Sequence, residues 1–101
     1  MDTEKLIAHA RARFDHDAAR KTLKEKYQGR MIFGHNGGMF KSTPEMITFL
    51  GLYGDQRIVV QDLYENPVEV NAKDLIDMMQ QKWYEQMNAW LVEYNDLSKK
   101  R

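Results

Sequence analysis

Three histidines are the side chains best suited to bind a metal ion or to move protons near neutral pH. His9 and His16 are seven residues apart, which on a helix separates them by about 10 Å, too far for one ion to bridge. Asp15 and Asp17 flank His16, but consecutive helical residues point in different directions and cannot converge on a metal. His35 lies in a glycine-rich turn. The sequence therefore predicts no metal site and no cofactor.

Other groups that could catalyse a reaction are few. There is no cysteine, and the two serines, Ser42 and Ser98, lack the G-x-S-x-G setting of a hydrolase nucleophile. Asp62, Glu65 and Glu69 could cooperate in acid-base catalysis, but exposed carboxylates of this kind commonly keep hairpin edges from pairing with other chains. We therefore expect a protein that is not an enzyme, with no catalytic residue and no small-molecule substrate.

A glycine-rich segment, residues 34–38, could let backbone N–H groups approach a phosphate. It lacks the P-loop pattern and the dinucleotide-binding pattern. Asn36 and Gly37 readily adopt the positive φ values of a type I′ turn. We therefore interpret the segment as the turn of a β-hairpin over residues 31–41.

Basic residues are concentrated near the start of the chain. Residues 2–30 hold eight basic and five acidic residues, although the fifteen of each kind in the whole chain balance. A basic helix can follow nucleic-acid phosphates, whereas i,i+4 pairs such as Arg13 with Asp17 are typical of a solvated helix. We expect any nucleic-acid binding to be weak, and the candidate contacts are Arg11, Arg13, Arg20, Lys24 and Arg30.

The most informative element is a helix expected from Ala72 to about Leu97, where nothing interrupts it over about 39 Å. Its apolar residues recur at spacings of 3 and 4, the alternation of a coiled-coil seam. The members of this seam are Ile76, Met79, Trp83, Met87, Trp90, Tyr94 and Leu97. Leu75, Met78, Tyr84, Leu91 and Val92 add a second apolar surface, so the helix is more apolar than one small sheet requires.

This breadth leaves two interpretations open. The helix is either packed wholly inside the chain, or part of its surface meets another subunit, since Met, Trp and Tyr are enriched at such contacts. The candidate interface residues are Trp83, Met87, Trp90, Leu91, Tyr94 and Leu97. Trp90 lies farther from the hairpins than Trp83, so Trp90 is the better candidate for an intermolecular anchor and Trp83 for the core.

The rest of the chain indicates how these residues are positioned. An apolar residue every four positions, at Leu6, Ala10, Phe14 and Ala18, predicts a helix over residues 3–28 with one thin packed side. Thr43-Pro44-Glu45 is typical of a helix start. Residues 57–64 and 68–70 alternate like two strands around a turn at 65–67. Asn71 and Asp74 resemble a capping box that begins the last helix.

These elements predict a single α+β domain over residues 1–101. Their order is a long N-terminal helix, a β-hairpin, a short helix, a second β-hairpin and a long amphipathic C-terminal helix. The length suffices for one hydrophobic core. The lack of cysteine and of any long apolar run favours a cytoplasmic protein that does not enter a membrane.

Four segments carry a resemblance to known proteins. They are Phe33-Gly34-His35-Asn36-Gly37-Gly38-Met39-Phe40-Lys41, Thr43-Pro44-Glu45, Tyr64-Glu65-Asn66-Pro67-Val68-Glu69-Val70 and Trp90-Leu91-Val92-Glu93-Tyr94. With them, the run from Met31 to Tyr94 resembles small proteins encoded by tailed bacteriophages of the T4-like and cyanophage kind. The resemblance implies a virion component or a phage accessory protein, found in the host cytoplasm or in the virion, and it implies no catalytic or ligand-binding residue.

We therefore expect a non-enzymatic structural or protein-interaction module, such as a phage virion or assembly component. It would act through its long aromatic C-terminal helix, as a homo-oligomer or with a protein partner. The alternative is a small nucleic-acid-associated accessory protein that uses the basic N-terminal helix.

Overall fold

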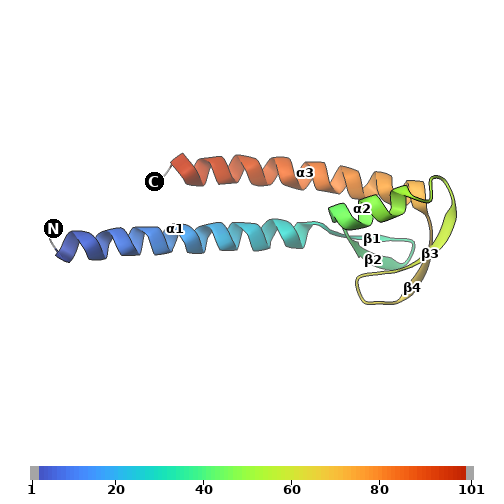
Figure 1. Cartoon of the computed structure of the whole chain (residues 1–101), viewed down its shortest axis with the longest axis horizontal. Coiled ribbons are helices and arrows are strands. Elements are labelled where there is room, and N and C mark those ends of the chain that lie inside the picture. Colours follow the sequence, from blue (N-terminus) through green and yellow to red (C-terminus); the bar gives the residue numbers. More distant parts are fainter. Residues whose placement is uncertain (1–2, 100–101) are drawn as a thin grey trace.

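Two long helices lie side by side and run in opposite directions, with a small β-containing head at one end (Figure 1). The computed structural model of the chain describes residues 3–99, apart from the side chains of residues 9, 12 and 14. The helices are α1 (Thr3–Arg30) and α3 (Ala72–Lys99). The molecule measures 65 × 24 × 20 Å, so it is an elongated α+β structure.

The head, residues 31–71, contains two antiparallel hairpins and a short helix. Its elements are β1 (Ile32–His35), β2 (Gly38–Lys41), α2 (Pro44–Gly51), β3 (Arg57–Gln61) and β4 (Pro67–Asn71). Each hairpin is a separate two-stranded sheet. In the first, Phe33 is opposite Phe40, and in the second, Ile58 is opposite Val70. The predicted α+β class, the two hairpins and the long C-terminal helix are thus confirmed.

Turns and helix starts follow the local sequence. Asn36 and Gly37 have φ values of 50° and 83°, as the predicted turn of the first hairpin requires. The Thr43 hydroxyl oxygen accepts a hydrogen bond from the Met46 N–H at 3.2 Å and caps α2. The Asn71 side-chain oxygen accepts one from the Asp74 N–H at 3.0 Å and begins α3.

The main core lies where the head meets the first turns of α3. Its centre consists of apolar residues from β2, α2, β4 and α3, which are Phe40, Leu50, Val70, Ala72, Leu75 and Met79. Ser42 is buried among them, and its hydroxyl donates a 2.6 Å hydrogen bond to the backbone carbonyl of Met79. This bond ties the end of the first hairpin to α3 and leaves the buried hydroxyl satisfied.

The prediction of a long packed N-terminal helix is wrong in extent. Every side chain that the structure describes before Asp15 is exposed, and Leu6 and Ile7 are each 50 % exposed. The part of this helix that packs in the fold is short, residues 15–30. The expected stripe relied on small side chains such as Ala10 and Ala18, both exposed, which offer too little apolar surface to hold a partner. The Phe14 side chain of that stripe lies outside the described residues.

Candidate interaction surface on α3

The contact between α1 and α3 is built around the buried ring of Tyr27. This ring stacks on Trp90, with centroids 6.1 Å apart and planes 6° apart. The Tyr27 hydroxyl donates to a carboxylate oxygen of Glu93 at 2.7 Å, and the Lys26 ammonium donates to the same oxygen at 2.8 Å. The Arg30 guanidinium lies 5.3 Å from the centre of the Tyr27 ring. The contact therefore combines aromatic packing with a charge-assisted network.

This network shifts two pKa values. The hydrogen bonds from Lys26 and Tyr27 hold the pKa of the Glu93 carboxyl below its ordinary value, although partial burial acts in the opposite direction. The hydrogen bond to Glu93, together with burial, raises the pKa of the Tyr27 phenol. Both shifts favour the pair with Glu93 ionised and Tyr27 protonated, the forms that can make these hydrogen bonds.

The predicted interface residues divide between two sides of α3. Trp90 is half-buried against Tyr27 of α1. Leu97 is half-buried and lines a hollow of about 300 Å³ between the helices, beside Ala19 and Leu23. Trp83 is half-buried where α3 meets α2. These three residues face other parts of the same chain.

Met87, Leu91 and Tyr94 lie farther round the helix, on a side that α1 does not cover. With Tyr84 they form a row that we name the outer α3 stripe, consisting of Tyr84, Met87, Leu91 and Tyr94. Tyr84 is 64 % exposed, Leu91 56 % and Tyr94 39 %, while Met87 is half-buried. An open hollow of about 190 Å³ on this row is lined by Met87, Trp90, Leu91 and Tyr94. The stripe is about 15 Å long.

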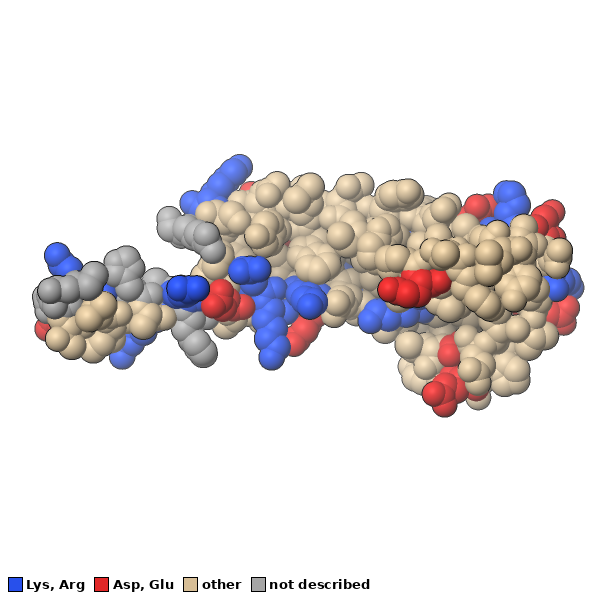
Figure 2. All heavy atoms as spheres, in the orientation of Figure 1, with Lys and Arg blue, Asp and Glu red and all other residues tan. Residues whose placement is uncertain are grey.

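The four side chains of the outer α3 stripe carry no charge, and a row of amides lies along one edge of it. Gln81, Asn88 and Asn95 succeed one another at intervals of seven residues and are all exposed beside it. In Figure 2 the surface over the middle of α3 is almost entirely tan, between the charged residues of α1 and those of the head. The surface is thus apolar with an amide edge, the composition of an interface centre rather than of an ordinary solvated helix face.

The uncharged surface continues from α3 onto the head. A second hollow, of about 220 Å³, is lined by Pro44, Ile47 and Thr48 of α2 and by Gln80, Trp83 and Tyr84 of α3. Tyr84 therefore belongs to the outer α3 stripe and also borders α2.

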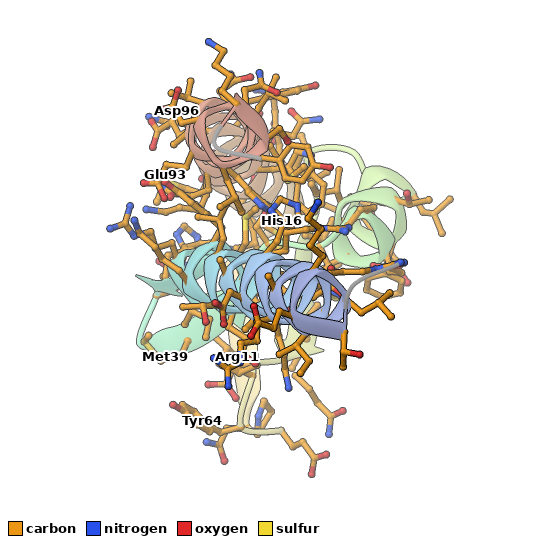
Figure 3. All side chains as sticks on the ribbon, turned by 90° about the vertical axis from the view of Figure 1, so that its left-hand side faces the viewer. Arg11, His16, Met39, Tyr64, Glu93 and Asp96 are labelled. Carbon is orange, nitrogen blue, oxygen red and sulfur yellow. The ribbon has the colours of Figure 1, made fainter. Side chains whose placement is uncertain are left out.

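The candidate nucleic-acid contacts are all exposed but do not share one face. Arg13, Arg20 and Lys24 are seven and four residues apart and lie on one side of α1. Arg20 is also 3.9 Å from the Asp17 carboxylate on the same helix. Figure 3 shows Arg11 on the side of α1 away from α3, whereas Arg30 lies over the Tyr27 ring. Figure 2 shows basic and acidic groups interspersed along α1.

The described histidines and hairpin carboxylates do not gather into a metal-binding cluster. Figure 3 shows His16 on the side of α1 that faces α3, and the His9 side chain lies outside the described residues. His35 packs edge-on against Phe40 in the first hairpin. Among the residues that the structure describes, no three potential metal ligands gather at one point. No described helix is long and apolar enough to cross a membrane.

Asp62 links the two hairpins through hydrogen bonds to backbone groups of both. Its carboxylate accepts hydrogen bonds from the backbone N–H groups of Met39, Tyr64 and Asn66, at 3.0 to 3.1 Å. These bonds, that from Asn66 above all, hold the pKa of Asp62 below its ordinary value, against the opposing effect of burial. Glu69 lies 3.6 Å from Arg57 across the second hairpin.

No family model, curated protein or solved structure matches the chain.

The sequence did not single out some residues that shape this surface. Tyr84 belongs to the expected second apolar surface but was not a candidate interface residue, and Pro44 and Ile47 of α2 were not expected beside α3. The seven-residue spacing of Gln81, Asn88 and Asn95 is visible in the sequence. It is the signal that would have separated an open side of the helix from the side that faces α1.

Proposed function

We propose that this chain is a non-enzymatic protein-interaction module that binds a protein partner through the outer α3 stripe. The observation that carries the proposal is an uncharged row of large side chains left open along α3, although the same helix packs Trp90 and Met79 inward. Burying apolar surface is favourable by roughly 25 cal/mol per Å². Tyr and Met are also enriched where proteins meet.

The charge of α3 supports a protein partner over an anionic one. The helix carries three basic residues, Lys73, Lys82 and Lys99, against five acidic residues, Asp74, Asp77, Glu85, Glu93 and Asp96. A helix that lies on an anionic membrane or on phosphates is instead rich in Lys and Arg. The outer α3 stripe therefore suits a partner surface that is itself apolar.

The resemblance of residues 31–94 to small proteins of tailed phages supports a role in a phage particle or in its assembly. Such a protein would act in the host cytoplasm or in the virion. An elongated molecule with an open helix face fits a part that is held between neighbours.

Photocrosslinking tests this proposal. A benzoylphenylalanine is placed at position 91 or at position 92, and each protein is irradiated both pure and in an extract of its natural source. Leu91 and Val92 are 56 % and 62 % exposed, but one helical residue turns the side chain by about 100°. Position 92 is therefore the matched control for position 91.

We expect an adduct of defined mass at position 91 and none at position 92. Equal labelling from the two positions, or no adduct from position 91, would contradict the proposal.

A second candidate is phosphate binding by α1, which is supported by Arg13, Arg20 and Lys24 sharing one exposed side. It is weakened by Asp17, because this carboxylate lies beside Arg20 and offsets its charge. Its test is the salt dependence of binding to a labelled duplex, which should be steep.

A further inference from the structure

We propose that the partner of the outer α3 stripe is a second copy of this chain, bound antiparallel about a two-fold axis near residue 89. This inference rests on the proposed function and specifies its partner. Three features of α3 support it, namely the order of residues in the stripe, the shape of its hollow and the position of its amides.

The stripe reads nearly the same in both directions. Its order is Tyr84, Met87, Leu91, Tyr94, with an aromatic ring at each end, aliphatic side chains in the middle and spacings of 3, 4 and 3. In a two-fold interface the same patch meets itself in reverse. Tyr84 of one copy then lies beside Tyr94 of the other, and Met87 lies beside Leu91, so each layer pairs side chains of similar size.

The hollow on the stripe has the composition of a coiled-coil hole. Its lining residues, Met87, Trp90, Leu91 and Tyr94, stand at positions i, i+3, i+4 and i+7. Four residues at that spacing surround each inserted side chain when two helices pack knobs into holes. The two-fold arrangement directs Met87 of the second copy toward this hollow and Met87 of the first toward its equivalent.

Charge also favours a second copy. Glu93 and Asp96 lie on other sides of α3, and Asp74 and Asp77 precede Tyr84, so an antiparallel pair centred near residue 89 does not bring these carboxylates opposite one another. The amides occupy the edge where the two helices would face each other. There Asn88 meets Asn88 of the second copy, and Gln81 meets Asn95, since amides both donate and accept hydrogen bonds.

The area of the stripe alone is small compared with the roughly 800 Å² per partner of a standard interface. However, the uncharged surface continues into the hollow between α2 and α3 that Tyr84 borders. The two-fold arrangement brings Tyr94 of the second copy to that end of the stripe. The contact therefore extends from α3 onto the head of each copy.

Single-cysteine variants test the arrangement, because the wild-type chain has no cysteine. The variants are Gln81→Cys, Asn88→Cys and Asn95→Cys, which change exposed amides and leave the stripe intact. A disulfide needs Cα atoms within about 7 Å. In the antiparallel dimer two copies of residue 88 meet near the axis, whereas two copies of residue 81 are separated by more than about 20 Å along the helices.

Under mild oxidation we therefore expect Asn88→Cys to form a covalent dimer alone. Gln81→Cys and Asn95→Cys should each form no disulfide-linked dimer by themselves. When the two variants are mixed, they should form a disulfide with each other. Covalent dimers from all three variants alone would show a parallel pair and overturn the proposal. The absence of dimers from Asn88→Cys would overturn it as well.

Light scattering at tens of micromolar provides the independent measurement. The wild-type chain should have twice the mass of one 12.0 kDa chain. Leu91→Glu should raise the dissociation constant by more than about tenfold, because it would bury an unpaired carboxylate. The matched variant Val92→Glu should leave the mass unchanged.

The two proposals fail in different ways. A wild-type chain that stays at 12.0 kDa overturns self-association. If position 91 then still crosslinks a different protein from the extract, the interaction role holds with another partner. If position 91 crosslinks nothing, both proposals are wrong.

Discussion

At the scale of single residues, Glu93 connects the two long helices. Its carboxylate accepts hydrogen bonds from Lys26 and from the Tyr27 hydroxyl, two neighbours on α1. These bonds are stronger to the ionised carboxylate than to the neutral carboxyl, and they therefore lower the pKa of Glu93. The packing of α1 on α3 should therefore depend on pH.

We expect the contribution of Glu93 to stability to be present at neutral pH and lost on acidification. A carboxyl whose pKa is lower in the folded state stabilises the fold above its unfolded pKa, and this stabilisation disappears as the pH falls through the folded pKa. Glu93→Gln should therefore lower the Tm at pH 7, and the difference from wild type should shrink below about pH 4. The control is Glu85→Gln, an exposed glutamate on the same helix. A constant Tm difference from pH 7 to pH 3 would show that the charge of Glu93 is irrelevant.

Trp90 distinguishes the two interpretations of the apolar seam of α3, which are packing inside the chain and contact with another subunit. Its ring stacks on buried Tyr27, so Trp90→Ala should cost about 2 to 3 kcal/mol of unfolding free energy, less than a fully buried Trp because the ring is half-buried. Tyr84→Ala, on the outer α3 stripe, should cost less than about 1 kcal/mol. Chemical denaturation measures both. A Trp90→Ala protein that is as stable as wild type but associates less would assign Trp90 to an intermolecular contact instead.

At the scale of elements, the two hairpins form one head because they touch closely at Gly38. A Cβ at this position would lie 2.8 Å from Val68 Cγ2 and 3.1 Å from the Phe40 ring. The Leu63 N–H also donates a 2.6 Å hydrogen bond to the Met39 carbonyl, and Asp62 accepts one from the Met39 N–H. The second hairpin is therefore held against the first at this point, and both are held against α3.

Gly38→Ala should separate the hairpins. We expect it to destabilise the fold by about 1 to 3 kcal/mol, because the backbone must shift to make room for the methyl group. Gly34→Ala, in the partner strand, is the matched control, since its Cβ would meet Met39 Sδ at an ordinary 3.6 Å. Thermal melting compares the two. Equal Tm values for the two variants would mean that the contact at Gly38 is not tight in solution.

At the scale of the whole molecule, the elongated shape determines how much apolar surface stays exposed to solvent. The radius of gyration is 19.3 Å, compared with about 13 Å for a compact domain of this length. A long, narrow shape has little interior, so many large apolar side chains remain exposed, on α3 and on the head alike. Association would cover some of this surface without any change in fold.

Charge at this scale limits nucleic-acid binding. Residues 2–30 have a net charge of +3 in a chain whose total is zero. Few counterions can be displaced from a nucleic acid, so any affinity should be weak and should fall steeply with salt. Fluorescence anisotropy with a labelled duplex, from low salt to 0.3 M, measures this. Tight binding that survives 0.3 M salt would contradict the expectation, and Arg20→Gln should weaken whatever binding exists.

The sequence by itself determined the local structure of this protein. The turn at Asn36 and Gly37, the caps at Thr43 and Asn71 and the uninterrupted C-terminal helix all depend on interactions within a few residues, which the sequence displays directly. The class of fold followed from their order. The set of candidate interface residues also followed, because an apolar period of 3 and 4 can be read without knowing what covers it.

Only the tertiary structure decided which side of α3 is covered. Both sides are apolar in the sequence, so the choice depends on α1. The buried Tyr27 ring of α1 stacks on Trp90, and the Lys26 ammonium binds Glu93, although these residues of α3 are 60 to 70 positions away in the sequence. The packed length of α1 was likewise undetermined, since helix propensity extends a helix beyond the point where it has anything to pack against. Because α1 covers the side of α3 that carries Trp90 and Glu93, the outer α3 stripe from Tyr84 to Tyr94 stays open.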